Sequence, residues 1–253
     1  MKKCAILAGV LSCAGAASAA NVSITVTNMQ APGGFSFTPV WLAAHDGLFD
    51  GFDVGSPGNA AITALAEGGS TGLLSAALGG MDTTLAQPDG APVFSPGESA
   101  STVLNVGDAS VNRFLSFASM IVPSNDLFMG NDDPMAYEMF DMGGNFNGPF
   151  DILVYGADIW DNGSEVNNAF GDAAFSVNGG TRVDENGVVT SFFDDPDAGA
   201  YLLSFVGTGT ADGGTIGETF DEGTLIARIR VVPAPGVMGG LALAGLAAAR
   251  RRR

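Results

Sequence analysis

Between its two ends, this 253-residue chain has no cysteine, no lysine and a single histidine, His45. Both cysteines, Cys4 and Cys13, lie within the first 20 residues, so no disulfide can link the loops of the remaining chain. The same absences exclude a cysteine nucleophile, a Schiff-base lysine and a histidine-rich zinc site from that part. A serine triad would have to use His45. We expect instead that His45 is a packing or hydrogen-bonding residue at the end of a strand.

Positive charge is also scarce. Of the ten basic residues, six lie among the first three and the last four residues, which leaves four arginines against 27 acidic residues and a net charge of −23 in between. Nucleic-acid binding is excluded, because contacts to phosphate need a basic face. Self-repulsion at this charge destabilises the compact state unless cations relieve it. The four arginines are Arg113, Arg182, Arg228 and Arg230.

The first 20 residues predict a secretory signal peptide. Lys2 and Lys3 precede the apolar run AILAGVL, and the small residues AGAASAA end the segment. Cleavage is expected after Ala19 or Ala20. A buried N-terminal helix and lipidation at Cys13 are the alternatives, but the Ala-Ser-Ala ending favours cleavage, and the residues before Cys13 match a lipidation box poorly. We therefore expect a secreted protein.

The last 22 residues, 232–253, read VPAPGVMGGLALAGLAAARRRR. The apolar run 237–249 is short for a bilayer core, which takes about 20 residues, and the arginines should stay on the cytoplasmic side. This tail of prolines, apolar helix and arginines resembles a PEP-CTERM sorting signal. The resemblance implies recognition by an exosortase, removal of the tail and delivery to the cell surface or extracellular matrix, with only transient contact to the membrane. An ordinary C-terminal anchor helix is the alternative.

Residues 21–231 predict one all-β domain, an antiparallel β-sandwich with one short helical patch. Short alternating apolar runs between Gly and Asp turns are typical of that class. Residues 60–78 predict one or two short helices broken at Gly68 and Gly69. Pro39 indicates that the second strand lies at a sheet edge or is bent. The expected strands are 22–29, 35–45, 101–107, 113–122 and 150–159, followed by a hairpin set at 188–193, 200–209 and 224–232, whose last strand should have one wet face.

Four segments, in order, resemble the spondin N-terminal domain family. The third segment matches a pattern of Val-Pro-Ser-x-Asp, an apolar pair and Gly, and the fourth matches Trp-Asp-x-Gly-Thr-Glu-x-Asn with Ser164 in place of Thr. The resemblance implies a C2-like antiparallel β-sandwich that serves in adhesion or matrix binding and holds a calcium ion between loops. The segments are FTPVWLAAHDGLFDGFDVG (37–55), ALAEGG (64–69), SFASMIVPSNDLFMG (116–130) and IWDNGSEVNNAFG (159–171).

The resemblance implies that Asp126 and Asp161 are calcium ligands and that Glu165 is a further ligand. A third carboxylate should come from the strand before the Val-Pro-Ser loop, where both Asn105 and Asp108 are candidates. Calcium takes six to eight oxygen ligands, and loops that end strands can supply them. Without a cation, clustered carboxylates in so acidic a domain would repel one another.

Capping is the alternative to metal binding. The side chain of Asp126 or of Asp161 can accept backbone N–H groups in an Asx-turn. For Asp132, Asp133 and Glu138, in the irregular stretch after the third segment, capping or solvation is the expectation.

The favoured function is a secreted, calcium-binding module without enzymatic activity, whose partner is a matrix polysaccharide or a surface protein. An extracellular polysaccharide-active enzyme of β-sandwich form is the main alternative, and a purely structural coat component is a third. Trp41 and Trp160 are either exposed ligand-binding aromatics or core residues.

Overall fold

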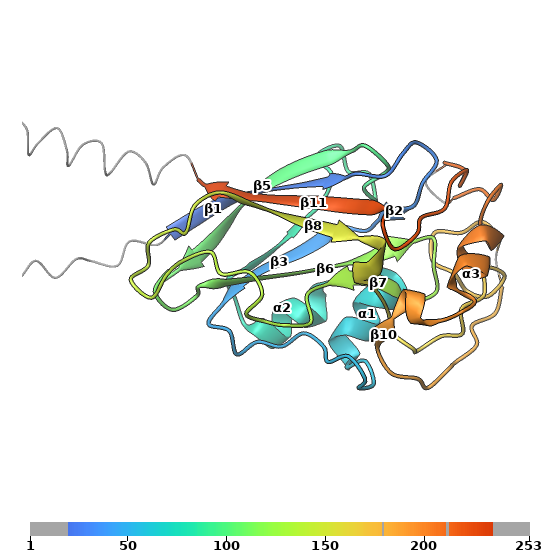
Figure 1. Cartoon of the computed structure of the whole chain (residues 1–253), viewed down its shortest axis with the longest axis horizontal. Helices are drawn as coiled ribbons and strands as arrows, with labels where there is room; N and C mark the ends of the chain where they lie inside the picture. Colours follow the sequence, from blue (N-terminus) through green and yellow to red (C-terminus); the bar gives the residue numbers. More distant parts are fainter. Residues whose placement is uncertain (1–19, 179, 211–212, 235–253) are drawn as a thin grey trace, which may run out of the picture.

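The structure is a computed structural model that describes residues 20–178, 180–210 and 213–234. Two antiparallel sheets pack face to face, with short helices on the outer side of one sheet and at one end of the molecule (Figure 1). This arrangement confirms the antiparallel β-sandwich. The predicted signal peptide lies outside the described residues except for Ala20, and the predicted sorting segment lies outside them after residue 234.

The first sheet carries both ends of the described chain. Alternation along its first strand places Val22, Ile24 and Val26 in the core, with polar residues facing solvent between them. In its last strand the arginines alternate with buried aliphatic residues, which confirms the predicted wet face. The strands of this sheet, in spatial order, are β5 (Ser99–Gly107), β1 (Ala20–Asn28), β11 (Leu225–Pro233) and β8 (Phe150–Tyr155).

The second sheet is buried on both faces at its centre. All nine residues of its strand β6 are buried, because the sandwich core covers one face and two helices cover the other. Pro39 separates two short strands where a single strand was predicted. The order is β10 (Thr190–Ser191), β9 (Ile159–Asp161), β7 (Leu127–Gly130), β6 (Phe114–Val122), β3 (Val40–His45) and β4 (Asp82–Leu85), and β2 (Ser36–Phe37) also pairs with β6.

The two helices on the second sheet are α1 (Ala60–Gly68) and α2 (Gly72–Leu78), as the sequence predicted. The side chain of Asn59 accepts the first free N–H groups of α1, and Gly69 ends that helix in the left-handed conformation at φ 67°. Their apolar residues form a second core against the outer face of the sheet. Two single turns, η1 (Gly156–Asp158) and η2 (Phe192–Asp194), complete the short helical elements before α3.

The structure corrects the prediction that 200–209 is a strand. This segment instead contains most of α3 (Ala198–Ser204), at the end of the sandwich away from the start of β1 (Figure 1). Ala198, Tyr201, Leu202 and Phe205 are buried, which is the i, i+3, i+4, i+7 spacing of a helix face. The predicted hairpin set is also absent, because β11 pairs with β1 and β8.

The folded domain is slightly longer than the predicted 21–231. Ala20 pairs with Gly107, and β11 continues to Pro233 opposite Val22. The N–H of Ala234 then donates to a backbone carbonyl of β1. None of the helices in the described part of the chain is long and apolar enough to cross a membrane.

Candidate metal centre

The turn that follows β6 is closed by Ser124. Its hydroxyl donates to the carbonyl of Ile121 at 2.6 Å and accepts the N–H of Leu127 at 3.1 Å, so the chain reverses from β6 into β7. Asn125 and Asp126 lie in this turn and are almost completely buried. Polar groups buried this deeply need partners, and those partners define the site.

Asn125 joins the turn to α3. Its N–H donates to the hydroxyl oxygen of Tyr201 at 2.9 Å, and the same hydroxyl donates to its Oδ1 at 2.9 Å. The N–H of Asn168 donates to this Oδ1 as well, at 3.0 Å. One asparagine therefore connects the turn, the helix and the loop after β9.

Asp126 joins the turn to the same loop. Its Oδ2 accepts the N–H of Ser164 at 2.8 Å, the hydroxyl of Ser164 at 3.0 Å and the N–H of Glu165 at 3.0 Å. Its Oδ1 is buried and has no hydrogen-bond donor among the described residues. One oxygen thus caps the loop, as the capping interpretation predicts, and the other oxygen is left without a partner.

Asp161 ends β9 and lies opposite Leu127, the residue that follows Asp126. Its Oδ1 accepts the N–H of Gly163 at 2.7 Å, which forms an Asx-turn. Its Oδ2 accepts a short hydrogen bond from the side-chain amide of Asn167. The β7–β9 pairing therefore brings Asp126 and Asp161 together, as the sequence predicted.

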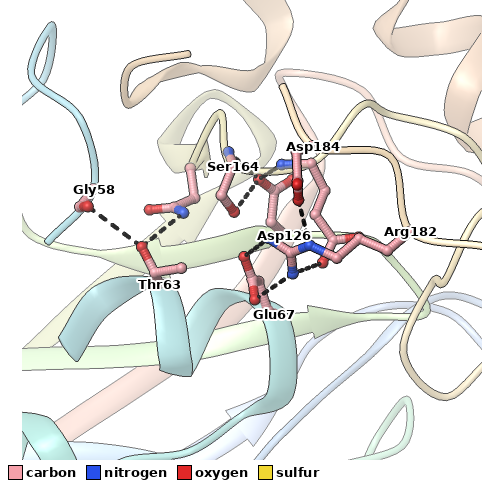
Figure 2. A network of polar contacts seen from close by, with 9 residues as sticks. Gly58, Thr63, Glu67, Asp126, Ser164, Arg182 and Asp184 are labelled. Atoms are coloured by element: carbon pink, nitrogen blue, oxygen red, sulfur yellow. Dashed lines mark hydrogen bonds and ion pairs between the residues drawn. The ribbon is translucent and has the colours of Figure 1, made fainter. Parts of the chain in front are cut away.

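Glu165 is buried in the same loop and pairs with Arg182. The Oε1 of Glu165 lies 2.6 Å from Nη1 of Arg182, whereas its Oε2 is buried and has no donor in the described part of the chain. Figure 2 shows the surrounding network, in which Arg182 also contacts Glu67 of α1 and Asp184.

Asp126 and Asp161 interact with each other, and all three carboxylates act on a nearby phenol. Burial, and then the charge of Asp161, raise the pKa of Asp126 to about 7. Burial raises the pKa of Asp161 and of Glu165 as well, although Arg182 opposes the shift at Glu165. Burial also raises the pKa of the Tyr201 hydroxyl, and the charges of all three carboxylates raise it further. The phenol of Tyr201 therefore lies near all three carboxylates.

Three buried side-chain oxygens of this turn and loop have no hydrogen-bond donor among the described residues. An acceptor buried in this way costs about 1–3 kcal/mol, and a single cation can satisfy several acceptors together. Carboxylate and amide oxygens are the ligands that calcium prefers. The donor set therefore fits a hard divalent cation. The three atoms are Asp126 Oδ1, Glu165 Oε2 and Asn167 Oδ1, whereas the unpaired Oδ1 of Asn162 faces Gly58.

Carboxylates alone do not make the site complete. Among the described residues, no three or more His, Cys, Asp or Glu side chains form a group that could hold a metal ion. Glu165 already shares its charge with Arg182. A calcium site here would therefore combine Asp126 and Asp161 with amide and carbonyl oxygens and the second oxygen of Glu165.

Asp108 and Asn105, the candidates for the third carboxylate position, lie at the other end of β6. They precede this nine-residue strand, which is about 30 Å long at about 3.3 Å per residue, and Asp126 follows it. Asp108 accepts the N–H and hydroxyl of Ser110 at 2.9 and 2.7 Å, and Asn105 accepts the N–H of Gly107 at 2.9 Å. The structure thus corrects this expectation, because both residues cap their own turns.

The other acidic residues near the turn have local partners, as expected. Asp132 accepts the N–H of Val54 at 3.0 Å, and Asp133 accepts the N–H of Met135 at 2.8 Å. Glu138 forms an ion pair at 3.1 Å that does not involve the site.

His45 is a buried hydrogen-bonding residue, as predicted. Its Nδ1 accepts the N–H of Gly47 at 3.1 Å, so its Nε2 carries the proton and donates to the hydroxyl of Ser116 at 2.9 Å. Burial lowers the pKa of His45. In this tautomer the imidazole cannot take the proton of Ser116. Residues 68–72, GGSTG, match the Gly-x-Ser-x-Gly spelling of a nucleophile turn, but they join two helices and not a strand to a helix.

Both tryptophans pack with the second core. Trp41 is buried and donates its indole N–H to Asp82 at 2.9 Å. Trp160 is partly buried against the same core and donates to the carbonyl of Gly130 at 2.8 Å. They are therefore core residues and not exposed aromatic platforms.

An open acidic pocket with a volume of about 630 Å³ lies beside Asp161. Burial raises the pKa of Glu185 in its wall, and the charges of Asp161 and Asp195 raise it further. The carboxylates that line this pocket are Asp161, Glu185, Asp194, Asp195 and Asp197.

The residues that hold the acidic groups in place were not identified from the sequence. Asn162 and Asn167 stand inside the fourth resembling segment, and amide oxygens in a loop with Asp and Glu are a usable signal for calcium. The helical spacing around Tyr201 was a second signal. Nothing in the sequence indicated that Arg182 contacts Glu165 from 17 residues further along the chain.

Comparison of the chain with models of known protein families finds no family that matches it, and comparison with curated proteins finds no match.

Proposed function

We propose that this chain is a secreted, calcium-binding module of the cell surface or extracellular matrix, with a C2-like sandwich of the spondin N-terminal type. The observation that carries the proposal is the set of orphaned buried oxygens around Asp126 and Asp161. In a domain with a net charge of −23, this convergence of carboxylates is costly unless a cation relieves it.

A calcium ion would supply positive charge at this site. Asp126 and Asp161 would provide carboxylate oxygens, Glu165 its free Oε2, and Asn167 an amide oxygen. These residues belong to the turn after β6 and the loop after β9, so their shared binding would hold the two segments together. This role needs no nucleophile or general base, consistent with a binding module.

The binding role and the location come from sequence resemblance. The four spondin-like segments support adhesion to a matrix polysaccharide or a surface protein. The tail at 232–253 supports sorting by an exosortase to the cell surface.

Calcium titration of the full-length protein tests the metal site. We expect heat on titration with calcium chloride, and a melting temperature that rises with calcium and falls with a chelator. At one hundred times Kd the stabilisation is about 2.7 kcal/mol. Magnesium should be a poor substitute, because it demands a tighter octahedron of ligands. A protein whose melting ignores both calcium and chelator contradicts the proposal.

The acidic pocket favours one alternative, a polysaccharide-active enzyme. Glycoside hydrolysis uses two carboxyl groups, one of which has a raised pKa and acts as the acid. Glu185, whose pKa is raised beside Asp161 and Asp195, fits that description. Release of reducing ends from matrix polysaccharides measures this activity. If the wild type shows turnover and Glu185→Gln loses it while keeping the fold, the result supports the enzyme and not the binding module.

A further inference from the structure

Arg182 is the only cationic side chain that contacts the candidate metal centre among the described residues. Its guanidinium bridges three carboxylates from different segments. It donates two hydrogen bonds of 2.7 and 2.8 Å to Glu67 of α1 (Figure 2). It also donates to Glu165 and to Asp184, each at 2.6 Å. The two-pronged contact with Glu67 fixes the plane of the guanidinium.

The contact with Glu165 has a specific consequence. The side chain of Glu165 is only 5% exposed, so its oxygens depend on partners within the protein. Arg182 binds one oxygen, Oε1, which fixes the rotation of the carboxylate. The other oxygen, Oε2, is a buried acceptor without a hydrogen bond among the described residues, although the side-chain amide of Asn125 lies close enough to Glu165 to lower its pKa.

We propose that Arg182 is a positioning residue for the calcium site, which holds Glu165 in the orientation that leaves Oε2 free for the cation and couples cation binding to α1 through Glu67. This inference rests on the proposed calcium binding and deepens it. It assigns the ordering of the site to a residue that does not itself contact the ion.

Arg182 also repels a nearby cation, so the sign of its effect has to be decided. Its side chain is 41% exposed and is shared among three carboxylates, which screens its charge. Its effect on the orientation of Glu165 acts through a direct contact with a buried group. Loss of a hydrogen-bonded partner behind a metal ligand typically weakens metal affinity by about 10–100-fold. The effect of Arg182 on the orientation of Glu165 therefore outweighs its repulsion of the cation.

The test compares calcium affinities of the full-length protein by titration calorimetry. We expect Arg182→Gln to weaken calcium binding by about 10–100-fold. Arg182→Lys should recover part of the affinity, because an ammonium pairs with one carboxylate but cannot form the fork with Glu67. Arg113→Gln is the matched control, since it removes the same charge from an ion pair with Glu138 outside the site, and it should leave the affinity unchanged.

Hydrogen exchange supplies a readout that a purely structural role would not move. In the wild type, calcium should slow amide exchange in α1, because the ion, Glu165, Arg182 and Glu67 form one connected chain. In Glu67→Gln the ion should still bind, but the protection of α1 should no longer depend on calcium.

The outcomes separate this inference from the proposed function. A wild-type protein without calcium binding overturns both. A wild type that binds calcium, with Arg182→Gln binding as tightly as Arg113→Gln or more tightly, overturns the role of Arg182 alone. If Arg182→Gln does not fold, Arg182→Lys decides, and an affinity equal to that of the wild type overturns the inference.

Discussion

Tyr201 and Asn125 exchange two hydrogen bonds, so α3 is fastened to the turn that presents Asp126. The phenol accepts the N–H of Asn125 and donates to its side-chain oxygen, each at 2.9 Å. Both residues are buried, and neither bond is exposed to competition from bulk water. The turn between β6 and β7 is therefore held from outside the sheet by a helix that lies 76 residues further along the chain.

Tyr201→Phe should lower the free energy of unfolding by about 1–3 kcal/mol, because it leaves the buried N–H of Asn125 without a partner. Urea unfolding monitored by fluorescence measures the change. Tyr155→Phe makes the same chemical change at an exposed ring, for which we expect a difference below about 0.5 kcal/mol. Equal effects of the two substitutions would contradict the anchoring role of Tyr201.

Asp126→Asn should abolish the stabilisation by calcium without unfolding the protein. The amide oxygen can still accept the N–H groups of Ser164 and Glu165, while the buried charge is lost. In chelator the variant should therefore be at least as stable as the wild type. In calcium the wild type should gain about 2.7 kcal/mol at one hundred times Kd, and the variant should gain little.

Asp133→Asn is the matched control for that substitution. Asp133 also caps a backbone N–H, that of Met135, but it lies outside the site. It should keep the full calcium response. If Asp126→Asn keeps it too, capping explains Asp126 and metal binding does not. Asp161→Asn should behave like Asp126→Asn, and the double substitution should add little, because both residues act through one ion.

The pH dependence of stability should differ between the wild type and Asp126→Asn. The pKa of Asp126 is raised from 3.8 to about 7, so the folded state binds this proton more tightly than the unfolded chain. Its contribution to stability is present below about pH 4 and is lost as the pH rises through about 7. His45, whose pKa is lowered, acts in the opposite direction and is common to both proteins.

Measured in chelator, the wild type should therefore lose stability relative to Asp126→Asn between about pH 4 and about pH 7. Calcium affinity of the wild type should rise over the same interval, because the ion displaces a proton from Asp126. Parallel stability profiles for the two proteins would show that Asp126 is ionised throughout.

Removal of the tail after Ala234 should release the protein into the medium. The cut must follow Ala234, because Pro233 pairs with Val22 and the N–H of Ala234 donates to Asn21. Fractionation of cells that express the full-length and shortened chains measures the distribution. Identical distributions would contradict a sorting role for the tail. A chain ended at Val231 should fold less stably, since it lacks the last residues of β11.

The strands whose side chains alternate between core and solvent could be predicted from the sequence, because this alternation is local. Residues 22–29 and 224–232 were predicted on that basis, and β1 and β11 have nearly those bounds. The short helices within 60–78 were also predicted from the sequence, including the break between them at Gly68 and Gly69. The strand predicted at 200–209 was wrong. Tyr201, Leu202 and Phe205 are buried at the spacing of a helix face, and the search for alternating residues does not detect that spacing.

The sequence also determined that Asp126 and Asp161 follow apolar strands and that Glu165 stands close behind. Which of these side chains lie close together depends on how the strands pair in the folded protein. The pairing of β7 with β9 brings Asp126 beside Asp161. Asp108 lies far from both, because the whole length of β6 separates it from Asp126. The ion pair of Glu165 with Arg182 also depends on the fold. Arg182 contacts Glu165 from a loop, and the separation of two charges along the chain does not predict their distance in space.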